Sequence, residues 1–175
     1  MLTGAPGAAL LYAVIGLLVS PRHDQAGTAQ RPAPWAAPAW ATLWLGGAVL
    51  QVLPGRDTNT AISMSLAMNA SGAPAWFAAV DNRLAVLVPP YGVSVVVDLV
   101  VLQALVGVGA LMGRRVLLAS VVAGIGLSLT YWVTGQDMGQ LWSGVATDPN
   151  TTPLIILLGV AVLGSDARRR GQGCR

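Results

Sequence analysis

Residues 91–112 read YGVSVVVDLVVLQALVGVGALM and contain a single charged side chain, Asp98. A transmembrane helix needs about 20 mostly apolar residues, because each residue advances an α-helix by about 1.5 Å and the hydrocarbon core is about 30 Å thick. This stretch is therefore predicted to cross a membrane as a helix, and it decides the fold class of the chain.

Four further stretches share this apolar character and are predicted to be spans. They cover residues 2–20, 36–53, 116–133 and 150–167. The last has the shortest uninterrupted apolar core, which runs only from Pro153 to Ser165. The prediction is an all-α fold: a polytopic transmembrane helix bundle of about five spans, forming one membrane domain over residues 1–175.

The composition favours the same fold class. Hydrophobic residues make up 54% of the chain, charged residues 10%, and the mean hydropathy is +0.64. A soluble domain carries about a quarter charged residues, so the surface of this chain is predicted to face lipid over much of its area. The bilayer is thus its first expected partner.

Arginine placement predicts the orientation of the bundle. Two arginines follow the first predicted span, two follow the third and three follow the fifth: Arg22, Arg31, Arg114, Arg115, Arg168, Arg169 and Arg170. If all five spans are real, these residues lie on one side, and only Arg56 and Arg83 lie on the other. Basic loops stay in the cytoplasm, which predicts an outside N-terminus and a cytoplasmic C-terminus.

The outer loop, residues 54–90, is predicted to contain two amphipathic helices. In the first, Ile62 and Leu66 share a face, with two methionines beside it. In the second, an apolar face recurs at helical spacing opposite a polar one. The apolar face is Trp76, Phe77, Val80, Leu84 and Leu87, and the polar face is Asp81, Asn82 and Arg83. Both helices are predicted to lie in the headgroup region or to cap the bundle.

Asp98 is the most informative polar residue inside a predicted span. A charged Asp near the bilayer centre costs about 3 kcal/mol, so such residues usually face a bundle interior or a cavity. Asp98 is therefore predicted to point at another helix, with Ser128 and Thr130 as candidate partners at similar depth. Two readings stay open: a proton- or cation-binding carboxylate, and a structural, hydrogen-bonded Asp, which is favoured because a single acid is weak evidence.

A second candidate site lies in the last outer loop. Asp137 and Asp148 flank this polar segment and are the candidate ligands of a small-molecule site. The alternative, which is favoured, is that Asp148 or Asn150 caps the last helix, with Pro153 in its first turn.

Several functional classes lack their residues. His23 is the only histidine and Cys174 the only cysteine, so bis-histidine haem ligation, a Ser-His catalytic pair and a thiolate metal site are excluded. No cofactor and no metal are predicted, and the protein is not expected to be an enzyme. The basic residues lie between apolar runs and form no stripe, so no nucleic-acid partner is expected.

Three segments resemble a group of uncharacterised actinobacterial membrane proteins. They are residues 43–53, the ASGAPAWF stretch at residues 70–77, and residues 131–158, which include the specific ATDPNTTP sequence. The resemblance covers about two-thirds of the chain and implies a multi-pass protein of the bacterial plasma membrane. It carries no activity, cofactor or catalytic residue with it.

Two functions follow as hypotheses. The first is a non-enzymatic accessory or scaffold subunit, which binds other membrane subunits or itself, because packing ridges are present without catalytic residues. Ser120, Gly124 and Ser128 form such a ridge, and Gly107 and Gly109 another, so the spans at 91–112 and 116–133 are expected to meet along them. The second is a small transporter or channel component that uses Asp98 as an intramembrane proton or cation site.

Overall fold

The computed structural model describes residues 12–17, 34–53, 60–135, 138 and 151–173. These residues are all-helical, and none of them lies in a strand. Residues 12–17 are helical, and the later helices follow in chain order: α2 (Ala36–Gln51), α3 (Ala61–Ala70), α4 (Ala75–Leu87), the 3₁₀ turn η1 (Pro89–Tyr91), α5 (Gly92–Gly109), α6 (Arg114–Gly135) and α7 (Thr151–Gly173). The all-α prediction is confirmed.

The helix bounds correct the predicted spans in detail. The span predicted at 91–112 ends three residues early as a helix, because α5 gives way at Ala110 to a turn in which Met112 N–H donates to the Gly109 carbonyl at 3.2 Å. The span predicted at 116–133 is longer at both ends. The helix predicted at 150–167 continues through Asp166 and the three arginines to Gly173.

In the part of the chain that the structure describes, fewer helices are long and apolar enough to cross a membrane than the five spans predicted from the sequence. Within the described residues, two helical segments are long and apolar enough to cross a membrane, Pro89–Gly109 and Arg114–Gly135. The apolar part of α7, Thr151–Ala167, is shorter, and α2 has 16 residues. Most of the first predicted span, 2–20, lies outside the described residues.

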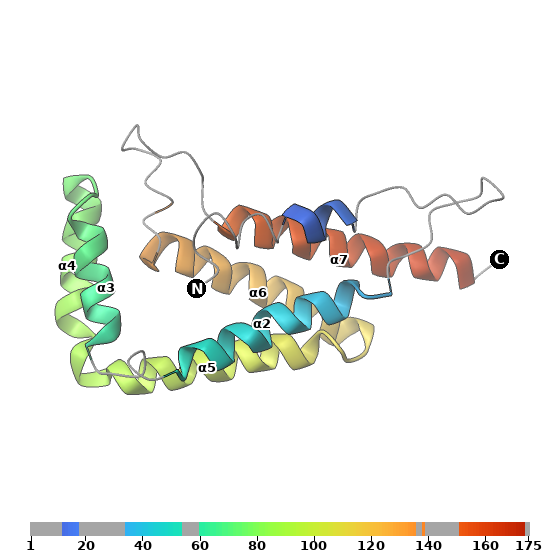
Figure 1. Cartoon of the computed structure of the whole chain (residues 1–175), viewed down its shortest axis with the longest axis horizontal. Helices are drawn as coiled ribbons and strands as arrows, with labels where there is room; N and C mark the ends of the chain where they lie inside the picture. Colours follow the sequence, from blue (N-terminus) through green and yellow to red (C-terminus); the bar gives the residue numbers. More distant parts are fainter. Residues whose placement is uncertain (1–11, 18–33, 54–59, 136–137, 139–150, 174–175) are drawn as a thin grey trace.

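Four helices form an antiparallel bundle, and a helical hairpin crosses one end of it. Figure 1 shows α2, α5, α6 and α7 running alongside one another in alternating directions, with the α3–α4 hairpin standing across the end where α5 begins and α6 ends. This placement agrees with the predicted capping role of the outer-loop helices. The opposite end gathers the start of α2, the end of α5 and the start of α6.

The hairpin buries a different face of α4 from the one predicted. Phe77 and Asp81 are buried, whereas Trp76, Val80 and Leu87 are exposed. The cause is the hairpin itself, because α3 packs on the side of α4 that carries Phe77 and Asp81. Apolar side chains on the outer face suit contact with lipid headgroups and acyl chains.

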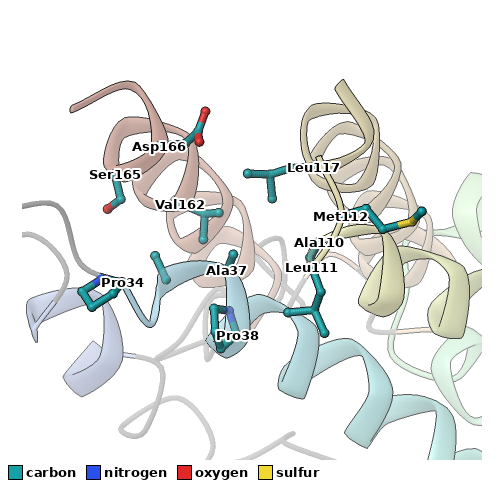
Figure 2. Close-up of a pocket in the computed structure, with 11 residues that line it drawn as sticks. Pro34, Ala37, Pro38, Ala110, Leu111, Met112, Leu117, Val162, Ser165 and Asp166 are labelled. Carbon is teal, nitrogen blue, oxygen red and sulfur yellow. The ribbon is translucent and has the colours of Figure 1, made fainter. Parts of the chain in front are cut away.

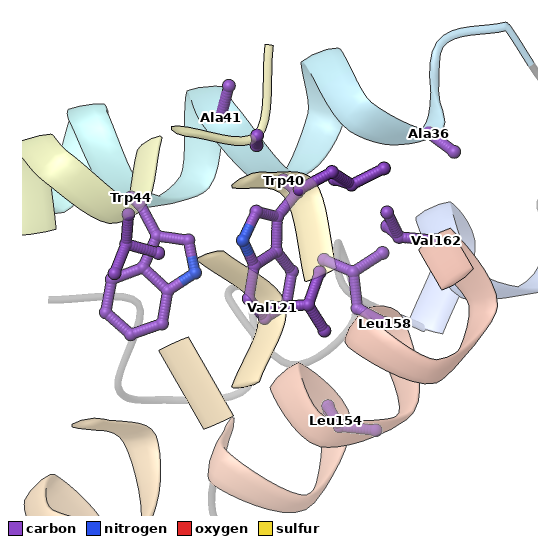
Figure 3. Close-up of a cluster of buried hydrophobic side chains, with 11 residues drawn as sticks. Ala36, Trp40, Ala41, Trp44, Val121, Leu154, Leu158 and Val162 are labelled. Carbon is purple, nitrogen blue, oxygen red and sulfur yellow. The ribbon is translucent and has the colours of Figure 1, made fainter. Parts of the chain in front are cut away.

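The core of the bundle is built around two tryptophans of α2. Trp40 is completely buried and Trp44 nearly so, and their ring centroids lie 5.8 Å apart. Figure 3 shows both indoles pointing from α2 toward α6 and α7, where they meet aliphatic side chains. Both side chains therefore belong to the packed core of the bundle.

Glycines on the facing helices make room for these rings. A Cβ atom at Gly124 of α6 would lie 2.5 Å from Trp40 Cζ2, and one at Gly159 of α7 would lie 3.2 Å from the same ring. The predicted contact between the small-residue ridges of α5 and α6 is therefore confirmed only at Gly109, whose Cβ would lie 3.3 Å from Ser120 Cβ. Gly107 faces Leu45 of α2, as Gly124 faces the tryptophans.

Candidate functional site

Asp98 lies on the outer surface of α5. It is exposed, and so are Val97, Val101 and Leu105 around it, with Leu105 64% exposed. The prediction that Asp98 points at another helix of the chain is wrong. Its physical reason is the packing of α5, which turns the opposite face, with Gln103 and Gly107, toward the bundle interior.

The predicted partners of Asp98 lie elsewhere. Ser128 of α6 is buried, and its backbone carbonyl accepts a hydrogen bond from Thr152 Oγ1 of α7 at 3.2 Å. Thr130 is exposed, and its hydroxyl donates to the Gly126 carbonyl of its own helix at 3.1 Å. The structure does not bring the three residues together, so the candidate intramembrane site reduces to Asp98 alone.

The second candidate site cannot be placed. Asp137 and Asp148 both lie outside the described residues. Their role as ligands of a small molecule therefore stays a prediction.

A polar cluster inside the bundle was not predicted as a site. Gln51 of α2 and Gln103 of α5 both donate amide hydrogens to the Tyr131 hydroxyl of α6, at 3.1 and 2.6 Å. In the sequence, Gln51, Gln103 and Tyr131 are isolated polar residues of three separate predicted spans. The available signal was depth, since Gln51 and Tyr131 stand near the same end of their helices.

The cluster leaves hydrogen-bonding capacity unused. Gln51 Oε1 and Gln103 Oε1 are buried without a partner. The Tyr131 oxygen accepts two bonds, and its own hydrogen has no acceptor among the described residues. Buried polar groups are normally paired, so unpaired ones at a cavity point to a ligand or to water.

Two residues of this cluster, Gln51 and Tyr131, line a groove of 410 Å³ between the hairpin and the bundle. Its described lining is mostly aliphatic and comes from α3, α4, α5 and α6, with Gln51 and Tyr131 among the polar members. A volume of this size with an apolar wall and a few converging polar groups is typical of a small-molecule site.

A smaller pocket of 320 Å³ lies at the opposite end of the bundle (Figure 2). It lies between the start of α2, the turn after α5 and the last part of α7. Ser165 in its wall is buried with an unpaired hydroxyl, and Asp166 forms an ion pair with Arg114 at 3.8 Å. An ion pair this exposed stabilises by less than about 1 kcal/mol, so it orients α7 against α6 only weakly.

Asp81 is a buried carboxyl in the α3–α4 hairpin. It is 1% exposed, its Oδ2 has no partner, and burial raises its pKa above the ordinary value of 3.8. A raised pKa means that the folded hairpin holds the proton more tightly than the unfolded chain does. The protonated Asp81 therefore contributes its full stability at a pH below its pKa in the unfolded chain. This contribution is lost as the pH rises through its pKa in the folded hairpin.

The substitution Asp81→Asn is therefore expected to remove the loss of thermal stability that the wild type shows as the pH rises above the ordinary carboxyl pKa of 3.8. At neutral pH this variant should be at least as stable as the wild type, because a neutral amide avoids the cost of burying a carboxylate charge. Thermal unfolding of both proteins in detergent at several pH values measures the effect. Parallel pH profiles for the two proteins would contradict the assignment.

The described residues contain no candidate metal site, and the comparisons with known proteins found no match. Among the described residues, no group of three or more His, Cys, Asp or Glu side chains comes close enough to hold a metal ion. No protein-family model, curated protein or solved structure matches this chain. The resemblance to actinobacterial membrane proteins accordingly stays a prediction.

Proposed function

We propose that this chain is a non-enzymatic membrane protein that serves as an accessory or scaffold subunit, and that it binds a partner through the Asp98 face of α5. The observation that carries the proposal is the exposure of Asp98. Asp98 is the tenth residue of the 21-residue apolar segment Pro89–Gly109, so it falls at the middle of a candidate span.

An exposed acid at this depth needs a partner. Lipid offers no hydrogen bond to a carboxyl group in the hydrocarbon core, and a charged Asp there costs about 3 kcal/mol. A neighbouring helix that brings a basic or hydrogen-bonding side chain offsets this cost. The apolar side chains around Asp98 supply the packing surface, since membrane helices associate through close contact and a few polar bonds.

A second copy of the chain fits this face less well than a different protein does. In the two long apolar segments the only basic residues are Arg114 and Arg115, which lie at a segment end and not at the depth of Asp98, so a symmetric pair would bring acid against acid. Two carboxylates that share a site repel each other unless one is protonated. The proposed partner is therefore a transmembrane helix with a basic side chain near its middle.

Purification of the tagged full chain in mild detergent tests the proposal. We expect a second membrane protein in stoichiometric amount, and cross-linking from position Val101 should reach it, because Val101 lies one turn from Asp98 on the same face. Cross-linking from Val122, which is exposed on α6, is the matched control. A chain that purifies alone and monodisperse would overturn the proposal.

For the topology, we propose five spans in a bacterial plasma membrane, with the N-terminus outside and the C-terminus in the cytoplasm. The antiparallel bundle supports this arrangement, because Arg114 and the C-terminal end of α7 lie at the same end. The hairpin then lies outside. Reporter fusions at Gly27, Gly72 and Arg170 are expected to report inside, outside and inside. A cytoplasmic Gly72 would contradict both the span count and the orientation.

The rival proposal is a transporter or channel component with Asp98 as its proton or cation site. Because Asp98 faces outward from the bundle, this function requires an assembly whose shared interior contains Asp98. The rival predicts gradient-driven flux in liposomes that Asp98→Asn abolishes while the protein stays folded. Absence of flux from the wild-type protein under imposed proton and cation gradients removes it.

A further inference from the structure

We propose that the groove between the α3–α4 hairpin and the bundle binds the hydroxyl head of a neutral lipid alcohol, with Gln51 and Tyr131 as its hydrogen-bonding residues. The groove has a volume of 410 Å³, and its described walls are mostly aliphatic side chains, such as Leu66, Leu84 and Leu99. Such walls suit the chain of a lipid, and the site lies where the hairpin meets the outer ends of α2 and α6.

The polar groups of the groove require a ligand head that both donates and accepts a hydrogen bond. Gln51 Oε1 is a buried acceptor without a partner, and the Tyr131 hydroxyl hydrogen is a donor without an acceptor among the described residues. A ligand hydroxyl satisfies both, because it donates its hydrogen to Gln51 and accepts one from Tyr131. A ketone or an ester only accepts and would leave the Gln51 carbonyl unpaired, at a cost of about 1–3 kcal/mol.

The two threonines of the lining already donate hydrogen bonds within α6. Thr130 donates to the Gly126 carbonyl at 3.1 Å, and Thr134 donates to the Thr130 carbonyl at 2.9 Å. Gln103 faces away from the groove, since its Oε1 would lie 2.7 Å from a Cβ atom at Gly47. Gln103 therefore positions the Tyr131 hydroxyl, to which it donates at 2.6 Å, and does not touch the ligand.

The head is neutral because the described lining offers no charge to pair with it. None of the described lining residues is ionic. A carboxylate or phosphate drawn into this groove would be buried without a counter-charge, which is far more costly than burying a hydroxyl. Charged lipids should accordingly be excluded.

The test uses the full chain in lipid nanodiscs and a photoreactive hexadecan-1-ol with a diazirine in its chain. We expect saturable labelling of α4 and α5. Unlabelled hexadecan-1-ol should compete for it, and hexadecyl methyl ether, which cannot donate, should compete about three- to tenfold less well, as the loss of one hydrogen bond predicts. Hexadecanoate should compete least.

Variants identify the residues. Gln51→Leu should remove the preference for the alcohol over the ether, and Tyr131→Phe should weaken both about three- to tenfold. Val95→Trp fills the groove without touching the polar cluster and should abolish labelling in a protein of unchanged thermal stability. Tyr91→Phe, at an exposed tyrosine, is the matched control and should bind as the wild type does. Non-saturable labelling, or equal competition by alcohol and ether in the wild type, would overturn the proposal.

Discussion

Replacing Trp40 by alanine is expected to lower the free energy of unfolding by about 3–5 kcal/mol, which is the cost of removing a large aromatic side chain from a packed interior. Trp40 is fully buried, and its ring packs against the backbone of Gly124 on α6 and Gly159 on α7, where no side chain intervenes. Its loss creates a cavity where three helices meet, and rigid helices cannot collapse to fill it.

Equilibrium unfolding of the detergent-solubilised protein measures this loss. Trp76→Ala is the matched control, because Trp76 is 65% exposed on the hairpin and its removal leaves no cavity. Trp40→Phe should cost less than Trp40→Ala, since the ring stays and the unpaired Nε1 donor disappears. Equal stability of Trp40→Ala and Trp76→Ala would show that the α2 tryptophans do not form the core.

Replacing Asp98 by leucine is expected to reduce binding of the proposed membrane partner more than 100-fold. Removing one member of a buried ion pair costs about 3–5 kcal/mol, because the other charge is left unpaired in a medium of low polarity. Asp98→Glu should retain most of the binding. Asp98→Asn should lie between the two, since an amide still forms hydrogen bonds but carries no charge.

Quantitative co-purification under one set of detergent conditions measures this series. Asp166→Leu is the control for loss of an acidic residue, because Asp166 lies at the end of the bundle in an ion pair with Arg114. Binding that survives Asp98→Leu unchanged would remove Asp98 from the interface. Since the Asp98 side chain is exposed, the thermal stability of the isolated protein should change by less than about 0.5 kcal/mol.

The helices could be predicted from the sequence because apolar run length and charge are local properties. Residues 91–112 contain one charge, and a chain segment of this kind has few alternatives to a helix in lipid. The start of α4 has a local cause too, since Pro74 directly precedes Ala75 and proline suits the first turn of a helix. Helix ends were less accurate, because turns such as the one after Gly109 depend on how the next helix packs.

The facing of the helices could not be predicted in the same way. The apolar segment of α5 carries valine and leucine on all sides, so its periodicity does not tell which face meets the bundle. The general expectation that an acid turns inward then misplaced Asp98. The packing is set instead by the fit of Trp40 and Trp44 against glycines of other helices, which is a long-range property.

The polar cluster shows a second limit of the sequence. Gln51, Gln103 and Tyr131 come from three helices, and a single polar residue near a helix end or interface does not by itself indicate a site. Only their convergence on one hydroxyl oxygen, at 3.1 and 2.6 Å, makes them a candidate site. Depth along antiparallel helices predicts which residues stand at the same level, but rotation about each helix axis decides whether they meet.

We propose that α5 crosses a bilayer with Asp98 facing outward at mid-depth. A spin label at position 98 tests it, introduced by Asp98→Cys in a Cys174→Ser background and measured on the purified full chain in liposomes. We expect strong relaxation of this label by oxygen and weak relaxation by a water-soluble nickel chelate, with the reverse for a label at exposed Ser71 in the hairpin. If nickel relaxes the label at position 98 as strongly as the label at Ser71, then position 98 faces water and not the membrane interior.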